Sequence, residues 1–145
     1  MRRFAFNLEP VLRYRARREE AAAAEQAEAE RRRRQKEEAL ARTRAALDES
    51  LDGEPAGGVA ELMHRSLYHI HLQTVAMRQA GEVSRAAQEW AVCRERTVAR
   101  HRERLVLEKL KEKRQAVFFQ ELAVLEQKEN DEFSLRLHTS RQSGP

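Results

Sequence analysis

Three histidines lie close together in the sequence, and clustered imidazoles are a common way to bind a transition metal. They are His64, His69 and His71. A metal site on a helix needs two ligands four residues apart and an additional carboxylate, and these three histidines do not have that arrangement. We therefore predict no metal site.

A pair of acidic residues is the second candidate for chemistry. Asp131 and Glu132 are adjacent, so on a helix their side chains splay apart, and no cleft is indicated that would hold them together. The sequence also lacks the G-x-x-x-x-G-K-[ST] motif that cradles nucleotide phosphates. We predict that the protein is not an enzyme and that it binds no nucleotide or other cofactor.

A block of four arginines, Arg31–Arg34, could bind phosphate groups. On a helix these side chains project in all directions, and the flanking residues Glu28, Glu30, Glu37 and Glu38 balance their charge. The net charge of +4 is also a modest excess for 145 residues. A solvated helix face is therefore favoured over a nucleic-acid patch.

Two other residues are best explained by helix packing. Cys93 is the only cysteine, which excludes an internal disulfide and a multi-cysteine zinc site and fits a reducing cytosol. Trp90 lacks the groove of neighbouring aromatic residues that binds single-stranded nucleic acids. We expect both residues to occupy ordinary positions on a packed helix.

Long helices must carry all these residues. The composition is 36% charged, with five glycines and three prolines, which is typical of extended helices. The only strong break is Asp52–Gly58, with three of the glycines and one proline. We predict an all-α fold, a long two-helix antiparallel coiled coil (α-hairpin) in a single domain of residues 1–145. Its helices are expected at about 7–52 and about 59–137, with the turn at 52–58 and a soft spot at Gly81.

The first helix should be capped by Asn7, with Pro10 in its first turn. Phe4 and Phe6 precede this cap and are expected to fold back on the helix itself. Few large apolar residues follow, so a narrow alanine-rich seam should face the partner helix. Its late anchors are expected to be Leu40, Leu47 and Leu51.

The second helix contains a repeat of seven that predicts its seam. The members are Met63, Ile70, Met77, Ser84, Ala91, Val98 and Leu105. If the chain reverses near Ala56, Asn7 lies opposite about residue 105, and the rest of the second helix overhangs the first. The segment Arg104–Glu132 is rich in large apolar residues, so this overhang is predicted to bind a partner.

No targeting or membrane segment is indicated. The opening Met-Arg-Arg is not followed by a sustained apolar run or a small-residue cleavage site. No stretch has the length and hydrophobicity of a membrane span. We expect a soluble protein that is not exported.

Both ends of the chain carry short motifs that a known family shares. The opening FAFNLEPVLR, residues 4–13, fits the pattern F-x-F-x-L-x-x-V-L. The segments LEKLKEK, residues 107–113, and EQKENDE, residues 126–132, are similar to the patterns K-L-K-E-K and E-x-K-x-L-D-E. In these motifs the chain resembles the bacterial flagellar export protein FliJ family, except that Asn130 stands where the family usually has Leu.

The resemblance implies a stalk-like coiled coil similar to the central stalk of rotary ATPases. Such a protein inserts its terminal end into the hexameric flagellar export ATPase and promotes its hexamerisation and activity. It also docks on the cytoplasmic domain of the membrane export gate and escorts export chaperones. The implied location is cytoplasmic, peripherally associated with the inner face of the cell membrane at the flagellar base.

The same resemblance implies two groups of contact residues. The ATPase-binding end would comprise Phe4, Phe6, Leu8, Leu12, Phe118, Leu122, Leu125, Lys128, Asp131 and Glu132. The export-gate contact would comprise Tyr68, Leu72, Val75 and Gln79. For Leu72 and Val75 the alternative is that they pack in or beside the seam.

Two other functions remain open at this stage. One is a basic coiled coil that binds nucleic acid or anionic membrane, for which affinity would fall steeply with salt. The other is a passive structural spacer that dimerises. The coiled-coil form also fits the stalk of a related virulence secretion system.

Overall fold

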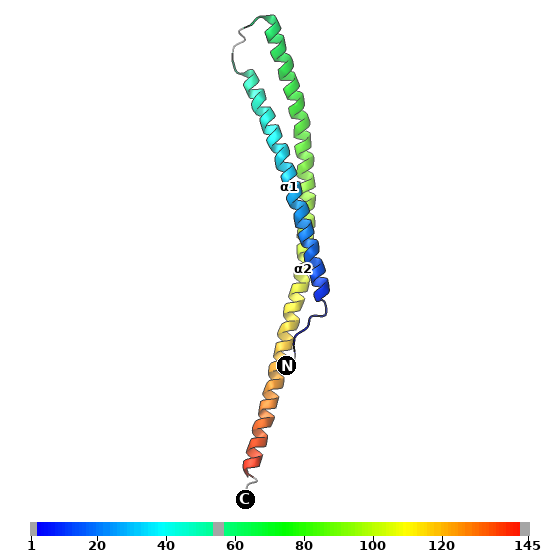
Figure 1. Ribbon diagram of the computed structural model, residues 1–145, viewed down its shortest axis with the longest axis vertical. Coiled ribbons are helices and arrows are strands. Elements are labelled where there is room, and N and C mark those ends of the chain that lie inside the picture. Colours follow the sequence, from blue (N-terminus) through cyan, green and yellow to red (C-terminus); the bar gives the residue numbers. More distant parts are fainter. Residues whose placement is uncertain (1–2, 54–56, 143–145) are drawn as a thin grey trace. The chain divides into compact units, whose positions relative to one another are not determined.

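The computed structural model describes residues 3–53 and 57–142 of the chain, so the predicted turn residues Glu54, Pro55 and Ala56 lie outside the described residues. It contains two helices, α1 (Glu9–Leu51) and α2 (Val59–Gln142), packed against each other (Figure 1). There is no strand within the described ranges. The predicted all-α hairpin of two long helices is confirmed.

The helix ends differ slightly from the prediction. α1 begins at Glu9, after the expected cap at Asn7, with the Glu9 amide bonded to the Phe6 carbonyl at 3.0 Å. α2 runs without a break through Gly81 and continues past Leu137 to Gln142. The extension is understandable because neither glycine nor proline occurs between Leu137 and Gln142 to stop the helix.

The chain divides into two compact units, and each is described by itself. The terminal unit comprises Met1–Ala16 and Arg102–Pro145, and the turn unit comprises Arg17–His101. Each unit contains a part of α1 and a part of α2. That the whole chain acts as one domain stays a prediction.

Small side chains line α1 in the turn unit. Ala22, Ala29 and Leu40 are buried there, and all three lie on one face of the helix because their spacing is close to multiples of three and four. The predicted alanine-rich seam is therefore confirmed. Leu51 was predicted as an anchor, but it is exposed, because α1 ends at this residue and α2 does not cover it.

The predicted phase of the α2 seam is wrong. Met63, Ile70, Met77 and Val98 are exposed, as are Ser84 and Ala91, and Leu105 is half-buried. In the turn unit one row of buried and half-buried residues instead follows a spacing of four and three. Its members are His69, Leu72, Ala76, Gln79, Val83, Ala86, Trp90, Cys93, Thr97 and Arg100. This seam is mostly small or polar, so a search for large apolar residues selects a row on another face of the helix.

The pairing of the helices also differs from the prediction. In the turn unit Lys36 pairs with Glu82 and Glu25 with Arg96, at 3.0 and 2.7 Å. Paired residue numbers therefore add up to about 120, instead of the predicted 112 or so. The reason lies at the turn, where α2 extends past the end of α1 (Figure 1). As a result, Ser50 lies opposite His69.

Candidate functional site

The N-terminal segment of the terminal unit packs on α2. The ring of Phe4 lies 5.7 Å from that of Phe118, at an angle of 55°. Phe6 is 7% exposed, and the Arg114 guanidinium lies 5.8 Å from the centre of its ring. Aromatic pairs and cation–ring contacts of this kind hold the segment in place. Phe4 therefore contacts α2 rather than its own helix, which corrects the prediction.

Polar contacts fix the position of α1 on α2 in this unit. The Lys111 ammonium lies 2.8 Å from a carboxylate oxygen of Glu9. The Arg15 guanidinium donates a hydrogen bond of 2.9 Å to the backbone carbonyl of Glu103. Glu9 is thus opposite Lys111, and the N-terminal segment covers α2 as far as Phe118. The uncovered part of α2 starts after Leu122 instead of Leu105, because both the pairing and this segment extend the cover.

An open depression forms where the N-terminal segment meets α2. Its volume is about 460 Å³, with the larger part of its lining apolar. Its lining residues are Arg3, Phe4, Ala5, Lys113, Arg114, Val117, Phe118 and Glu121. Three cations and one carboxylate surround the aromatic rings, so the depression suits an apolar group that carries negative charge.

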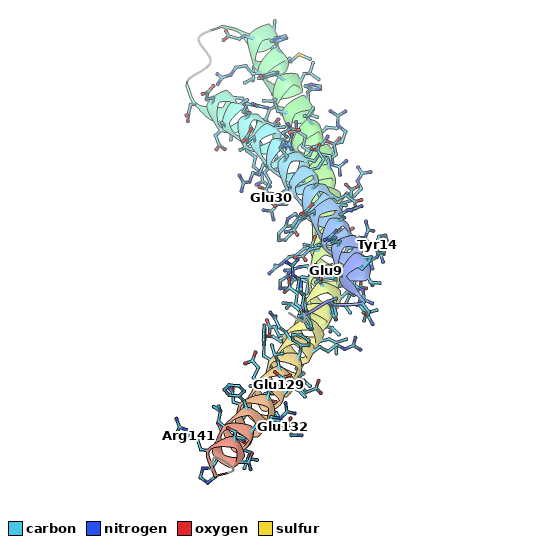
Figure 2. The ribbon with its side chains drawn as sticks, turned by 60° about the horizontal axis from the view of Figure 1, so that its bottom comes forward. Glu9, Tyr14, Glu30, Glu129, Glu132 and Arg141 are labelled. Atoms are coloured by element: carbon cyan, nitrogen blue, oxygen red, sulfur yellow. The ribbon has the colours of Figure 1, made fainter. Side chains whose placement is uncertain are left out.

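Beyond this depression, α2 is exposed on every described residue from Ala123 to Arg141. Figure 2 shows this part of the helix, including Glu129, Glu132 and Arg141, with its side chains projecting into solvent. It retains large exposed apolar residues, namely Val124, Leu125, Phe133, Leu135 and Leu137. At about 1.5 Å per residue it is about 30 Å long. An apolar surface of this extent is typical of a binding site.

The structure places the predicted ATPase-binding residues in three environments. Phe6 is buried; Phe4, Leu8, Leu12, Phe118 and Leu122 are half-buried; Leu125, Lys128, Asp131 and Glu132 are exposed. It brings Phe4 and Phe118 together, across the two ends of the sequence. Sequence reasoning missed Arg114, although the basic run before the two phenylalanines could have indicated it, and it placed Phe119 in the predicted overhang without assigning it to the contact residues. Their role in binding stays a prediction.

The predicted export-gate residues do not share one exposed face. Tyr68 is 49% exposed, whereas Leu72 is buried, and Val75 and Gln79 are half-buried. Leu72 thus packs in the seam, in agreement with the alternative interpretation. Tyr68 is the member of this group that a partner can reach most easily.

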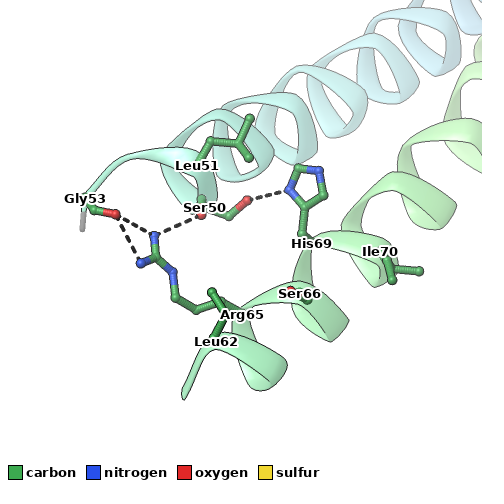
Figure 3. Close-up of a pocket in the computed structure, with 8 residues that line it drawn as sticks. All are labelled: Ser50, Leu51, Gly53, Leu62, Arg65, Ser66, His69 and Ile70. Carbon is green, nitrogen blue, oxygen red and sulfur yellow. Dashed lines mark hydrogen bonds between the residues drawn. The ribbon is translucent and has the colours of Figure 1, made fainter. Parts of the chain in front are cut away.

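The turn unit has a second open depression, where α1 ends beside α2. Its volume is about 400 Å³. The Arg65 side chain donates hydrogen bonds to the carbonyls of Ser50 and Gly53, at 3.3 and 3.1 Å (Figure 3). The Ser50 hydroxyl lies 3.1 Å from Nδ1 of His69. Arg65 and His69 of α2 thus both contact the end of α1. The remaining lining of the depression is largely apolar.

The arginine block of α1 is balanced by neighbouring carboxylates. Arg33 and Arg34 both reach Glu30, at 3.0 and 3.1 Å, and Arg31 pairs with Glu28 at 3.1 Å. Arg33 also lies over the Trp90 ring, 4.6 Å from its centre. The ion pairs support the interpretation of the block as a solvated face. The contact with Arg33 of α1 places Trp90 in the seam, as expected.

Two exposed ion pairs shift the protonation of their members. The hydrogen bond and charge of Lys36 lower the pKa of Glu82, and those of Glu112 raise the pKa of Lys109. Neither pair lies in a cleft. The Lys36–Glu82 pair therefore contributes to helix pairing in the turn unit. The Lys109–Glu112 pair contributes to the stability of α2 itself in the terminal unit.

The described residues contain no group of three or more His, Cys, Asp and Glu side chains arranged to hold a metal ion. Within the same part of the chain, no helix combines the length and the hydrophobicity that are needed to cross a membrane.

Comparison with known proteins identifies one family. The family model described as flagellar FliJ protein matches residues 4–143. The match spans both helices and includes the N-terminal segment and the exposed end of α2. Neither the curated proteins nor the solved structures provide a significant match.

Proposed function

The chain belongs to the flagellar FliJ protein family, and from this premise we propose that it is the stalk of a flagellar export ATPase. Family membership makes it a component of the flagellar protein export apparatus. In the proposed role it promotes hexamerisation and activity of the ATPase, couples the ATPase to the membrane export gate, and escorts export chaperones. It works at the cytoplasmic face of the flagellar base.

The observation that carries this proposal is the exposed apolar end of α2 in the terminal unit. Leu125, Phe133 and Leu135 are exposed there with charged residues between them. A helix with apolar residues on several faces is normally one that another surface covers. The inner surface of a ring-shaped ATPase would cover all sides of one helix at once.

The proposed mechanism follows from a mismatch of symmetry. A single rod inside a ring of six equivalent subunits cannot make the same contacts with each of them. It therefore favours different conformations in different subunits, which is a coupling between binding and the conformational equilibrium. The cations around Phe4 and Phe118 would guide docking more than they add affinity.

The test is ATP hydrolysis by the cognate export ATPase with and without the protein. We expect that Phe119→Glu raises the concentration needed for half-maximal stimulation about tenfold or more, since it puts a charge into an apolar contact. Phe119 is 53% exposed, so the substitution leaves folding intact. Phe118 is less suitable because it packs against Phe4.

The matched control is Val92→Glu on the same helix but in the turn unit, where Val92 is 54% exposed. This variant should stimulate the ATPase like the unaltered chain. Full stimulation by Phe119→Glu and by Leu125→Glu would contradict the stalk proposal. Equal loss in the Val92→Glu variant would indicate a nonspecific effect of added negative charge.

The proposed gate contact depends on Tyr68. We propose that the exposed Tyr68 ring makes the contact while Leu72 supports the helix from the seam. Tyr68→Ala should then weaken binding to the cytoplasmic domain of the gate without lowering ATPase stimulation. Unchanged gate binding, measured by calorimetry, would remove Tyr68 from the contact.

A further inference from the structure

Two neighbouring cations on α2 lack a carboxylate partner in the terminal unit. Lys113 and Arg114 are both exposed. Among the described residues, neither lies within ion-pair distance of a carboxylate. The preceding cation on this part of α2, Lys111, is by contrast paired with Glu9 at 2.8 Å. The positive charge of Lys113 and Arg114 is therefore available to another molecule.

Two neighbouring carboxylates further along α2 are in the same situation. Asp131 and Glu132 are exposed, and Figure 2 shows Glu132 at the solvent-facing end of the helix. Neither makes a hydrogen bond or an ion pair with any other residue that the structure describes. The terminal unit thus carries one unpaired basic pair and one unpaired acidic pair.

The spacing in sequence puts the two pairs on the same face of α2. Lys113 and Asp131 are 18 residues apart, and so are Arg114 and Glu132. With 3.6 residues per turn, this spacing corresponds to about five complete turns, so the members of each combination point in the same direction. At about 1.5 Å per residue, the basic and acidic pairs are separated by about 27 Å along the helix.

The face between the two pairs has the pattern of a helix–helix seam. Val117 and Val124 are each 51% exposed, and Glu121 and Lys128 alternate with them at a spacing of four and three residues. Val117 and Glu121 also line the depression beside the N-terminal segment. The two valines are half exposed because neither α1 nor the N-terminal segment covers this seam completely.

We propose that this seam, residues 113–132 of α2, pairs with the same seam of a second copy in an antiparallel dimer. A two-fold axis at the middle of the seam places Lys113 of each copy opposite Asp131 of the other. It likewise places Arg114 of each copy opposite Glu132 of the other. Both ion pairs form twice, and the exposed apolar residues between them become covered.

The charges inside the seam also fit a second copy. Glu121 lies about one helical turn from Lys128 of the second copy along the helix axis, which is within reach of a long lysine side chain. Val124 of the second copy lies over the depression that Val117 and Glu121 line. The seam therefore has compensating charges near its centre as well as at its ends.

Other occupants match this face less well. A nucleic acid or an anionic membrane would be attracted by Lys113 and Arg114, but Asp131 and Glu132 on the same face would repel it. An acidic helix would meet the same repulsion at that end. A second copy presents both charges in the opposite order by symmetry, so every end of the seam meets its complement.

The dimer goes beyond the proposed function, because it needs no component of the export apparatus. Its consequence does rest on that function. Asp131 and Glu132 belong to the predicted ATPase-binding end, so dimer formation and insertion into the ATPase would compete for the same surface. The protein alone would then keep this end covered until the ATPase displaces the second copy.

The test is sedimentation velocity of the full-length chain over a range of concentrations. We expect a reversible monomer–dimer equilibrium that salt weakens. Lys113→Asp combined with Arg114→Glu should raise the dimer dissociation constant about tenfold or more, because carboxylates then face carboxylates. Asp131→Lys combined with Glu132→Arg should do the same. The variant with all four changes should dimerise like the unaltered chain, because each ion pair is restored with reversed polarity.

Two controls separate the seam from other causes. Arg42→Asp combined with Arg44→Glu makes the same change in charge at exposed positions of α1 in the turn unit, and should leave dimerisation unchanged. Phe119 lies about 200° around α2 from Val117, so Phe119→Glu should also dimerise normally. The stalk proposal instead predicts that Phe119→Glu weakens ATPase stimulation, so failure of either proposal can be recognised by itself.

A chain that stays monomeric at every concentration would overturn the proposal, whether or not it binds anionic vesicles. So would a dimer that the variant with four changes does not restore, or one that the Arg42 and Arg44 changes weaken equally. Circular dichroism checks that all variants stay helical.

Discussion

At the residue scale, the end of α1 shows how one side chain can close a helix. The last carbonyls of a helix have no partner within it. Gly53 turns the chain with φ of 95°, a conformation that glycine adopts easily. Arg65 of α2 then donates hydrogen bonds to the carbonyls of Ser50, Asp52 and Gly53, at 3.1 to 3.3 Å. Its positive charge also suits the negative end of the helix dipole.

We therefore predict that Arg65→Ala lowers the free energy of unfolding by about 1 kcal/mol, because charged hydrogen bonds to the helix end are lost. Arg65→Lys should recover only part of this, since an ammonium cannot bridge several carbonyls. Urea denaturation of the full chain measures both. Arg42→Ala, an exposed arginine on α1, is the control, and an equal loss there would contradict the capping role.

The two glycines Gly53 and Gly81 should respond oppositely to alanine. An added Cβ at Gly81 meets no atom within 4 Å, and Gly81 lies inside α2. Gly81→Ala should therefore stabilise the chain by about 0.5–1 kcal/mol. At Gly53 the positive φ opposes a side chain, so Gly53→Ala should destabilise it by about 1 kcal/mol. Thermal melts compare the pair, and stabilisation at both positions would disprove the strain argument.

At the element scale, the pairing of α1 with α2 depends on small residues. Ala29 is 1% exposed and Ala22 is 5% exposed. An alanine that is this well covered shows that the helices approach closely at its position. The facing seam on α2 includes the small residue Ala86, also buried. The contact in the turn unit therefore depends on close packing of small side chains, with few large apolar residues such as Leu40 and Leu72 among them.

We predict that Ala29→Leu destabilises the turn unit by about 1–3 kcal/mol, because the added carbons force the helices apart. Ala27→Leu places the same side chain on an exposed position of the same helix and should change stability by less than about 0.5 kcal/mol. Calorimetric melting of the two variants gives the comparison. Similar melting temperatures would mean that the seam has room for larger residues.

At the scale of the whole molecule, charge is distributed to pair the helices in each unit. The terminal unit has the Glu9 pair with Lys111. The turn unit has Glu25 with Arg96 and Lys36 with Glu82. These pairs are solvent-exposed, so each adds little by itself. Their joint effect is to disfavour other alignments of two long helices that have few large apolar residues between them.

Acid should weaken this pairing. The pKa of Glu82 is lowered below its usual 4.5 by Lys36. The stabilisation from Glu82 is therefore complete above that usual value and is lost as the pH falls through the lowered one. Glu82→Gln should reduce the loss in melting temperature between about pH 7 and about pH 3. Glu89 is an exposed carboxylate on the same helix, and Glu89→Gln should not reduce this loss. If both variants reduced the loss equally, the pair with Lys36 would not be its cause.

Local features of the chain were sufficient to predict the two helices. Helix hydrogen bonds join residues four apart, so the absence of glycine and proline from long stretches determines where helices form. The cluster of glycines between Asp52 and Gly58 likewise marked the turn. The motifs near both ends were enough to predict the family, which the family match confirmed. Within the predicted site, the packing of the N-terminal segment on α2 near Phe118 could not be predicted in this way, because it joins residues that are far apart in the sequence.

The sequence by itself determined the all-α hairpin, the alanine-rich seam of α1 and the FliJ family. Only the tertiary structure decided which of two rows on α2 faces α1. The rows of Ile70 and Leu72 both repeat every seven residues, and the more hydrophobic outer row is the exposed one. The physical reason is that helix formation is local, whereas burial depends on the partner. Arg65 at the turn and ion pairs along the helices set the alignment of α1 with α2. This alignment places the smaller side chains in contact.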